Sequence, residues 1–176
     1  MESYIVETPG GVLAINRDGS VIEKALFGKK AEEAAEKMRL LRSGTSIPEL
    51  NQLVLLLQKS GFDELVAEND SLAKALASAG ARETRVEAGV SVVTQLREKL
   101  GTDWKGRSKW LKQQRLDTKP LVDLDEYQKF VRQVTVELAR VAVTAAAAKR
   151  DLYAVQAVRA IDDIDKTLNL FAGRIR

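Results

Sequence analysis

The chain has 176 residues, a net charge of +3, and neither a cysteine nor a histidine. The missing residue types exclude disulfides, thiolate or imidazole metal sites, and nucleophilic pairs that depend on histidine. The amino terminus lacks the features of a signal peptide, and the most apolar short run, Leu53–Leu57, is far below the roughly 20 residues that span a bilayer. We therefore predict a soluble protein that suits a reducing cytoplasm.

The first residues predict an antiparallel meander of three short strands. Tyr4–Thr8 and Val12–Ile15 are β-type runs separated by a Pro-Gly-Gly turn. A second turn at residues 16–19, Asn-Arg-Asp-Gly, leads to Val21–Ile22. Each turn is short enough to join neighbouring antiparallel strands.

Two helices are expected next. Lys29–Ser43 repeats apolar residues at helical spacing, and Gly44 follows where a left-handed cap would end the helix. Ser46 and Glu49 then have the spacing of a capping box, with a proline in the first turn, so the second helix should run to about Ser60.

Strands and helices alternate in the rest of the first hundred residues. Asn69 or Asp70 is placed to cap the first of these helices. The expected order is a strand at 64–68, a helix at 71–79, a strand at 82–87 and a helix at 91–100. The fold class is therefore α+β, with a small mixed α/β domain over residues 1–101 followed by a long helix.

Residues 102–122 form a basic connector, with a helical piece expected around 109–116 and a boundary at Pro120. Residues 97–119 hold eight Lys/Arg and three Asp/Glu, a net charge of +5. The connector contains both tryptophans and allows three interpretations: a solvated joint, a protein contact, or an RNA contact. The candidate partner-binding residues are Trp104, Lys105, Trp110 and Arg115.

Residues 123–176 read as one helix, because no proline or glycine occurs between Pro120 and Gly173. At about 1.5 Å per residue it would be roughly 80 Å long, beyond what one domain can cover. Apolar residues recur from Leu124 to Val155 at alternating steps of three and four, the heptad seam of a coiled coil.

The apolar stripe then rotates around the helix. Beyond Val155 the steps become three, and the stripe continues to Phe171 in a different phase. Two faces imply two helical contacts. The predicted coiled-coil and dimer residues are Leu138, Val141, Leu152, Val155, Val158, Ile161, Ile164 and Leu168.

No catalytic constellation is evident. The Gly10-Gly11 pair lacks the spacing of a phosphate-binding loop. Asp162, Asp163 and Asp165 cluster on the long helix, but Lys166 lies within one turn and ion pairing along or between helices is the favoured interpretation. We predict no catalytic residues, no cofactor-binding residues and no metal site, so the chain is not expected to be an enzyme.

The segment RDLYAVQAVRAIDDIDKTLNLF, near the end of the chain, resembles the start of the coiled-coil region of the archaeal Nop-family scaffold protein of box C/D small ribonucleoproteins. The match is in residue identity and not only in helical period, and it includes Asp162, Asp163, Asp165, Lys166 and Asn169. Near the amino terminus, GVLAINRDGSVIEKAL and ELVAEN resemble the opening hairpin and a later strand of that family's first domain.

The resemblance implies a scaffold in the archaeal cytoplasm. Its first domain would bind fibrillarin, an S-adenosylmethionine-dependent methyltransferase, and the coiled coil would join a second scaffold chain. The assembled particle places methyl groups on guide-selected RNA 2′-hydroxyls, as in rRNA processing. The methyl-transfer residues would belong to fibrillarin, so this chain would need no cofactor.

The family continues beyond the matched region with a second, antiparallel helix and a Nop domain that engages the kink-turn protein and guide RNA. The sequence ends at Arg176, so we expect a truncated chain or a fragment, with those two partners bound only through the missing part. Three alternatives remain: a Nop-related splicing protein, a generic coiled-coil adaptor and, less favoured, a small α/β enzyme.

Overall fold

A computed structural model describes the backbone of residues 1–118 and 121–174 and the side chains of residues 1–118 and 121–168. The chain divides into two compact units, Met1–Leu138 and Ala139–Arg176. The boundary predicted at Pro120 lies outside the described residues, as do the side chains of Asn169 and Phe171 from the predicted stripe and motif.

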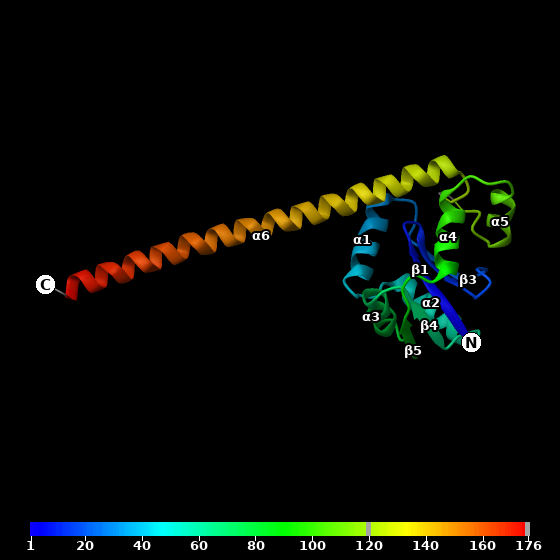
Figure 1. The fold of residues 1–176 in the computed structure, drawn as a ribbon, viewed down its shortest axis with the longest axis horizontal. Coiled ribbons are helices and arrows are strands. Elements are labelled where there is room, and N and C mark those ends of the chain that lie inside the picture. The colour runs from blue at the N-terminus through cyan, green and yellow to red at the C-terminus, as the bar shows by residue number, and fades with distance from the viewer. Residues whose placement is uncertain (119–120, 175–176) are drawn as a thin grey trace. The chain divides into compact units, whose positions relative to one another are not determined.

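In the described residues, five strands and six helices follow the predicted order, and the α+β fold class is confirmed (Figure 1). Most expected elements form within about two residues of their predicted bounds. The third strand is longer, and the helix expected at 109–116 begins two residues earlier and ends three residues earlier. The elements are β1 (Glu2–Thr8), β2 (Gly11–Ile15), β3 (Val21–Leu26), α1 (Ala31–Arg42), α2 (Pro48–Lys59), β4 (Glu64–Ala67), α3 (Asp70–Ser78), β5 (Glu83–Val86), α4 (Ser91–Gly101), α5 (Arg107–Gln113) and α6 (Leu124–Arg174).

The strands form one mixed sheet in the order β3-β2-β1-β4-β5. β1 pairs with β2 and β2 with β3 in antiparallel fashion, which confirms the predicted meander. β4 and β5 join the other side of β1 in parallel, because helices separate these strands in the chain and return it to the same edge. β1 is therefore the central strand.

Both faces of the sheet are covered. Along β1, Ile5 faces a core with α1, α2 and α3, whereas Tyr4 and Val6 face a core with α4 and α5. Figure 1 shows the sheet lying between α1 on one side and α4 on the other. All five residues of β2 are buried, as a strand packed on both faces requires.

The first turns of α6, up to Leu138, belong to this first unit. Phe130 and Val134 lie in the core with α1–α3, and Tyr127 lies in the core with α4 and α5. Tyr127 and Val134 are members of the predicted heptad seam. The interpretation of this part of the seam as a coiled-coil contact was wrong, because its apolar residues pack on the chain's own domain.

Local signals explain some of the helix ends. Gly44 has a φ of +81° and ends α1 in the expected left-handed conformation. The side chain of Asn69 caps α3 by accepting from the Leu72 backbone N–H at 2.9 Å. The capping box at Ser46 was wrong: Ile47 is the N-cap of α2, without a side-chain hydrogen bond. Burial of Ile47, only 2% exposed, fixes where α2 begins.

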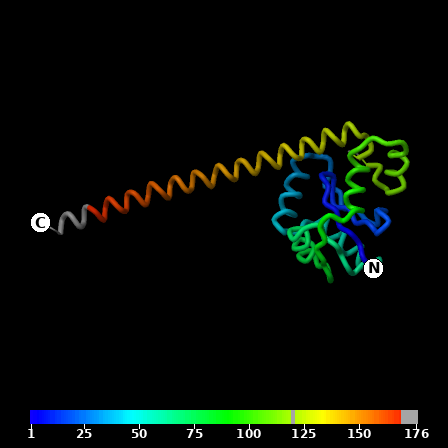
Figure 2. The backbone as a smooth tube through the Cα atoms, in the orientation of Figure 1, coloured from blue at the N-terminus to red at the C-terminus, as the bar shows by residue number. Residues whose placement is uncertain are grey.

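Residues 139–168 of the second unit are helical throughout (Figure 2). Every one of these residues is exposed within the single chain. Large apolar residues are among them, including Leu152 at 56% and Ile161 at 59% exposure. Within the described part of the chain, no helix combines the length and apolarity that crossing a membrane demands. We call residues 139–168 the rod.

Candidate functional site

The predicted basic connector packs against the outer edge of the sheet. Leu111 of α5 and Leu116 just after it are buried in the core with α4. The side chain of Gln114 accepts from the backbone N–H of Val21, on edge strand β3, with an N–O distance of 2.6 Å. The connector therefore covers an edge that would otherwise expose backbone groups for pairing.

The two tryptophans contact each other. The ring centroids of Trp104 and Trp110 lie 6.2 Å apart in an edge-to-face arrangement. The Trp104 indole N–H donates to the carbonyl of Lys99 at 3.2 Å, and the Lys99 ammonium lies 5.7 Å from the Trp110 ring centroid. Both indoles are half-buried and make these contacts within the domain.

The turn before α5 depends on a glycine beneath Trp104. Gly106 is the N-cap of α5 with a φ of +102°. A Cβ atom at this position would lie 3.3 Å from the Trp104 ring. Glycine thus permits both the left-handed backbone and the close approach of the indole.

Arg107 is a buried cation that the sequence analysis missed. It is 5% exposed, and its guanidinium donates to the carbonyls of Leu100, Leu121 and Val122 at 3.0–3.1 Å. These bonds tie the end of α4 to the segment that leads into α6. The signal was present: Arg107 precedes Leu111 by four residues, so both lie on the inner face of α5.

Lys105 and Arg115, the other two predicted partner-binding residues, do not join the tryptophan pair. Lys105 precedes α5 and Arg115 follows it, and both are exposed. The structure therefore brings together Trp104 and Trp110 and leaves the two cations on the surface at either end of the helix.

Charged side chains gather at the carboxyl ends of the parallel strands β1 and β4. Arg97 of α4 donates to both oxygens of the Glu68 carboxylate, at 2.5 and 2.8 Å, and to the Glu7 carbonyl at 3.1 Å. Arg42 lies 3.4 Å from the Glu7 carboxylate. Burial raises the pKa of Glu7 above its usual range, and Arg42 and Arg97 offset only part of this effect.

The end of the sheet that open α/β folds use for ligands is thus occupied by arginine–carboxylate pairs. A shallow pocket of about 390 Å³ beside it is lined mainly by apolar surface, including Pro9, Tyr127 and Val131 from β1's end and α6. Among the described residues, no group of three carboxylates could hold a metal ion. Both carboxylates, Glu7 and Glu68, are instead engaged by arginine side chains.

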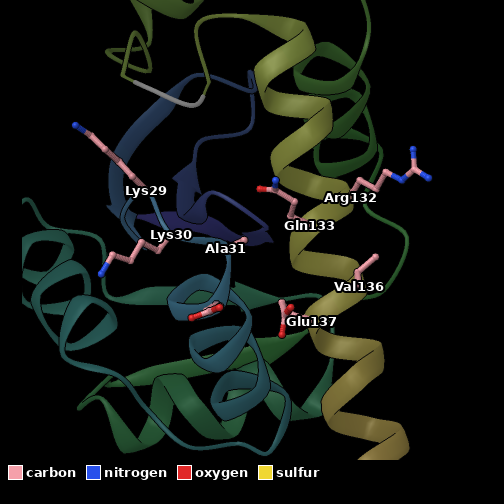
Figure 3. Close-up of a pocket in the computed structure, with 8 residues that line it drawn as sticks. Lys29, Lys30, Ala31, Arg132, Gln133, Val136 and Glu137 are labelled. Atoms are coloured by element: carbon pink, nitrogen blue, oxygen red, sulfur yellow. The ribbon is translucent and has the colours of Figure 1, made fainter.

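A larger hollow of about 620 Å³ lies between the start of α1 and the first turns of α6. Its cations do not converge. Figure 3 shows Lys29 and Lys30 pointing away from α6, while Arg132 points outward from the opposite wall. Lys30 also pairs with Glu33 at 3.6 Å. The hollow therefore offers no focused site for an anion.

The predicted coiled-coil residues separate into two groups. Leu138 is half-buried against the core with α1–α3 in the first unit. The others lie on the rod, each 42–60% exposed: Val141, Leu152, Val155, Val158, Ile161, Ile164 and Leu168. We call these seven residues the rod stripe. The ion pairing predicted along the helix is confirmed, since Lys166 lies 3.5 Å from Asp163.

Comparison with known families gives one match. Residues 2–143 match the family model described as Archaeal Nop5/56-rel, N-terminal domain. The matched range covers nearly all of the first compact unit and ends five residues into the second. A search of curated proteins finds no match.

Proposed function

Because the chain belongs to the archaeal Nop5/56-related N-terminal domain family, we propose that it is a non-catalytic scaffold of a box C/D ribonucleoprotein. In this proposal the first unit binds fibrillarin, and the rod stripe packs against helices of scaffold chains. Fibrillarin supplies the methyl-transfer chemistry and this chain supplies its position.

The observation that carries the proposal is the family match across the whole sheet domain. Two features of the chain support it. At the carboxyl ends of the parallel strands, where open α/β folds bind ligands, arginine–carboxylate pairs occupy the position. The rod stripe leaves seven large apolar side chains 42–60% exposed, and burying the exposed part of each one stabilises an assembly by about half of the roughly 1.5–3 kcal/mol that full burial gives.

Fibrillarin binding is tested by co-purification of the untagged chain with tagged archaeal fibrillarin. We expect a stoichiometric complex, and S-adenosylmethionine that binds the complex but not the scaffold alone. Micromolar binding of S-adenosylmethionine by the scaffold alone would favour the alternative that this chain is itself an enzyme. Failure of the two proteins to associate would overturn the fibrillarin part of the proposal.

The role of the rod is tested by sedimentation equilibrium. The wild-type chain should associate through its rod, and Val155→Asp with Ile161→Asp should shift it toward monomers. The matched control, Gln156→Asp with Thr167→Asp, adds the same two charges at polar positions of the same helix. A wild-type monomer whose circular dichroism shows the whole helix formed would refute the pairing.

A further inference from the structure

The surface around α5 carries five exposed cations: Lys99, Lys105, Lys109, Lys112 and Arg115. Within the described residues, none of the five forms an ion pair. The segment from Trp104 to Leu116 contains no acidic residue. Uncompensated positive charge is thus concentrated on one short helix and its flanks.

Two of these cations lie on one side of the helix. Lys109 and Lys112 are three residues apart within α5, so they share one side of it, and Lys105 lies in the turn just before the helix. The buried residues Arg107 and Leu111 take the opposite side. Because the inner side is fixed in the domain, the lysine side is held toward solvent.

Arg115 is held at the carboxyl end of α5 in an unfavourable backbone conformation. Its N–H bonds to the Lys112 carbonyl, and the next N–H, of Leu116, bonds to the Leu111 carbonyl at 2.7 Å. This is the Schellman arrangement that ends many helices, and its left-handed residue is usually glycine. Here it is an arginine with a φ of +56°, the one non-glycine residue with positive φ in the described chain.

The neighbouring aromatic rings do not offer a free stacking platform. Trp104 and Trp110 pack edge to face, and the Lys99 side chain lies over the Trp110 ring. The surface therefore presents charge without an exposed aromatic anchor. Protein interfaces depend on such buried anchors at their centre, whereas binding to a nucleic-acid backbone depends mainly on cations that neutralise phosphates.

We propose that Lys105, Lys109, Lys112 and Arg115, here named the α5 basic surface, bind the sugar–phosphate backbone of RNA without reading its sequence. The charge and the geometry identify a phosphate backbone as the ligand. The choice of RNA over DNA rests on the proposed function in a ribonucleoprotein. The surface would hold a strand of the assembled particle against the sheet domain.

The test is fluorescence anisotropy of the full chain with a labelled single-stranded RNA. With four phosphate contacts, affinity should fall about 50-fold between about 50 and 200 mM salt, at a slope of about 0.7 per contact. The variant Lys105→Glu, Lys109→Glu, Lys112→Glu should bind at least tenfold more weakly at low salt and lose most of the salt dependence. A wild-type chain that does not bind, or whose binding ignores salt, overturns the proposal.

The matched control is Lys29→Glu, Lys59→Glu, Lys74→Glu, three exposed lysines outside the connector with the same change of charge. It should keep most of the RNA affinity. Equal weakening by both triple variants would show a diffuse electrostatic effect and overturn the assignment to α5. Tighter binding of a polyglutamate peptide than of RNA to the same lysines would identify an acidic protein as the partner instead.

Arg115→Gly separates binding from folding. Removing one contact should weaken RNA binding two- to fivefold at low salt, while the glycine suits the left-handed position. Unchanged binding would remove Arg115 from the surface and contradict the proposal. Co-purification of the double variant Lys109→Glu, Lys112→Glu with fibrillarin should be unaffected, so the RNA surface and the fibrillarin contact can fail independently.

Discussion

The compact unit and the rod contain the same types of apolar residue, leucine and isoleucine, in opposite environments. Leu57 and Ile5 are fully buried in the sheet domain, whereas Leu152 and Ile161 on the rod are more than half exposed. α6 passes through both units, so helix propensity is not what separates them. The difference teaches that an apolar stripe predicts the need for a contact but not which surface supplies it.

The largest test of this comparison is a matched pair of leucine truncations. Leu57→Ala should lower the free energy of unfolding of the compact unit by about 2–5 kcal/mol, because it removes a fully buried side chain and leaves a cavity. Leu152→Ala should leave that free energy within about 0.5 kcal/mol, because the side chain is exposed. Denaturant titration followed by tryptophan fluorescence measures both.

The two tryptophans make this measurement selective, since both lie in the first unit and the rod has none. Circular dichroism reports the helix of the rod in the same samples. Equal losses of domain stability in the two variants would show that rod and domain unfold as one unit and would remove the contrast.

A second test asks whether the connector is part of the compact unit. Arg107→Met should lower the free energy of unfolding by about 2–3 kcal/mol, because three carbonyls lose a charged donor in a buried position. Arg107→Lys keeps the charge but cannot reach all three carbonyls, so an intermediate loss is expected. If Arg107→Met unfolds with wild-type stability, the connector is a joint that contributes nothing to the fold.

Most of the fold was predictable because its signals are local. Turn residues marked the meander, and the helical periods marked the helices to within about three residues. The capping box at Ser46 failed because burial of Ile47 outweighed a side-chain cap. The parallel placement of β4 and β5 beside β1 was not predicted, since strand order depends on contacts far apart in the chain.

The candidate site was less predictable, for a related reason. The sequence showed that the connector is basic, but the sequence analysis did not identify which of its cations turn inward. Arg107 turns inward to bind carbonyls, whereas Lys105 and Lys109 turn out. Likewise the heptad seam gave a correct apolar face, yet Tyr127 and Val134 found their partners in the chain's own sheet domain.

A smaller, stabilising effect is expected at Arg115. Arg115→Gly should raise the free energy of unfolding by about 1 kcal/mol, because a left-handed conformation costs a side-chain-bearing residue about that much. Gln113→Gly, at an exposed helical position in α5, should lower it by about 0.5–1 kcal/mol. Urea titration by tryptophan fluorescence compares them; a stabilising Gln113→Gly would show that the effect is not conformational.

The smallest effect concerns pH and the carboxylate at the end of β1. Because burial raises the pKa of Glu7 in the folded state, the folded chain binds this proton more tightly than the unfolded chain. The contribution of Glu7 to stability is therefore present below its unfolded pKa and is lost as pH rises through its folded pKa. The stability of the wild type relative to Glu7→Gln should therefore fall as pH rises through the folded pKa of Glu7.

Glu36→Gln is the control of opposite sign. The Glu36 carboxylate accepts hydrogen bonds from Arg39, at 2.6 and 2.9 Å, and these bonds lower its pKa. The wild type should therefore gain stability relative to Glu36→Gln as pH rises, while it loses stability relative to Glu7→Gln. Tryptophan fluorescence at several pH values measures both differences in the compact unit alone. If the two differences change in the same direction, pH acts on stability through net charge, and the burial of Glu7 is not the cause of the pH dependence.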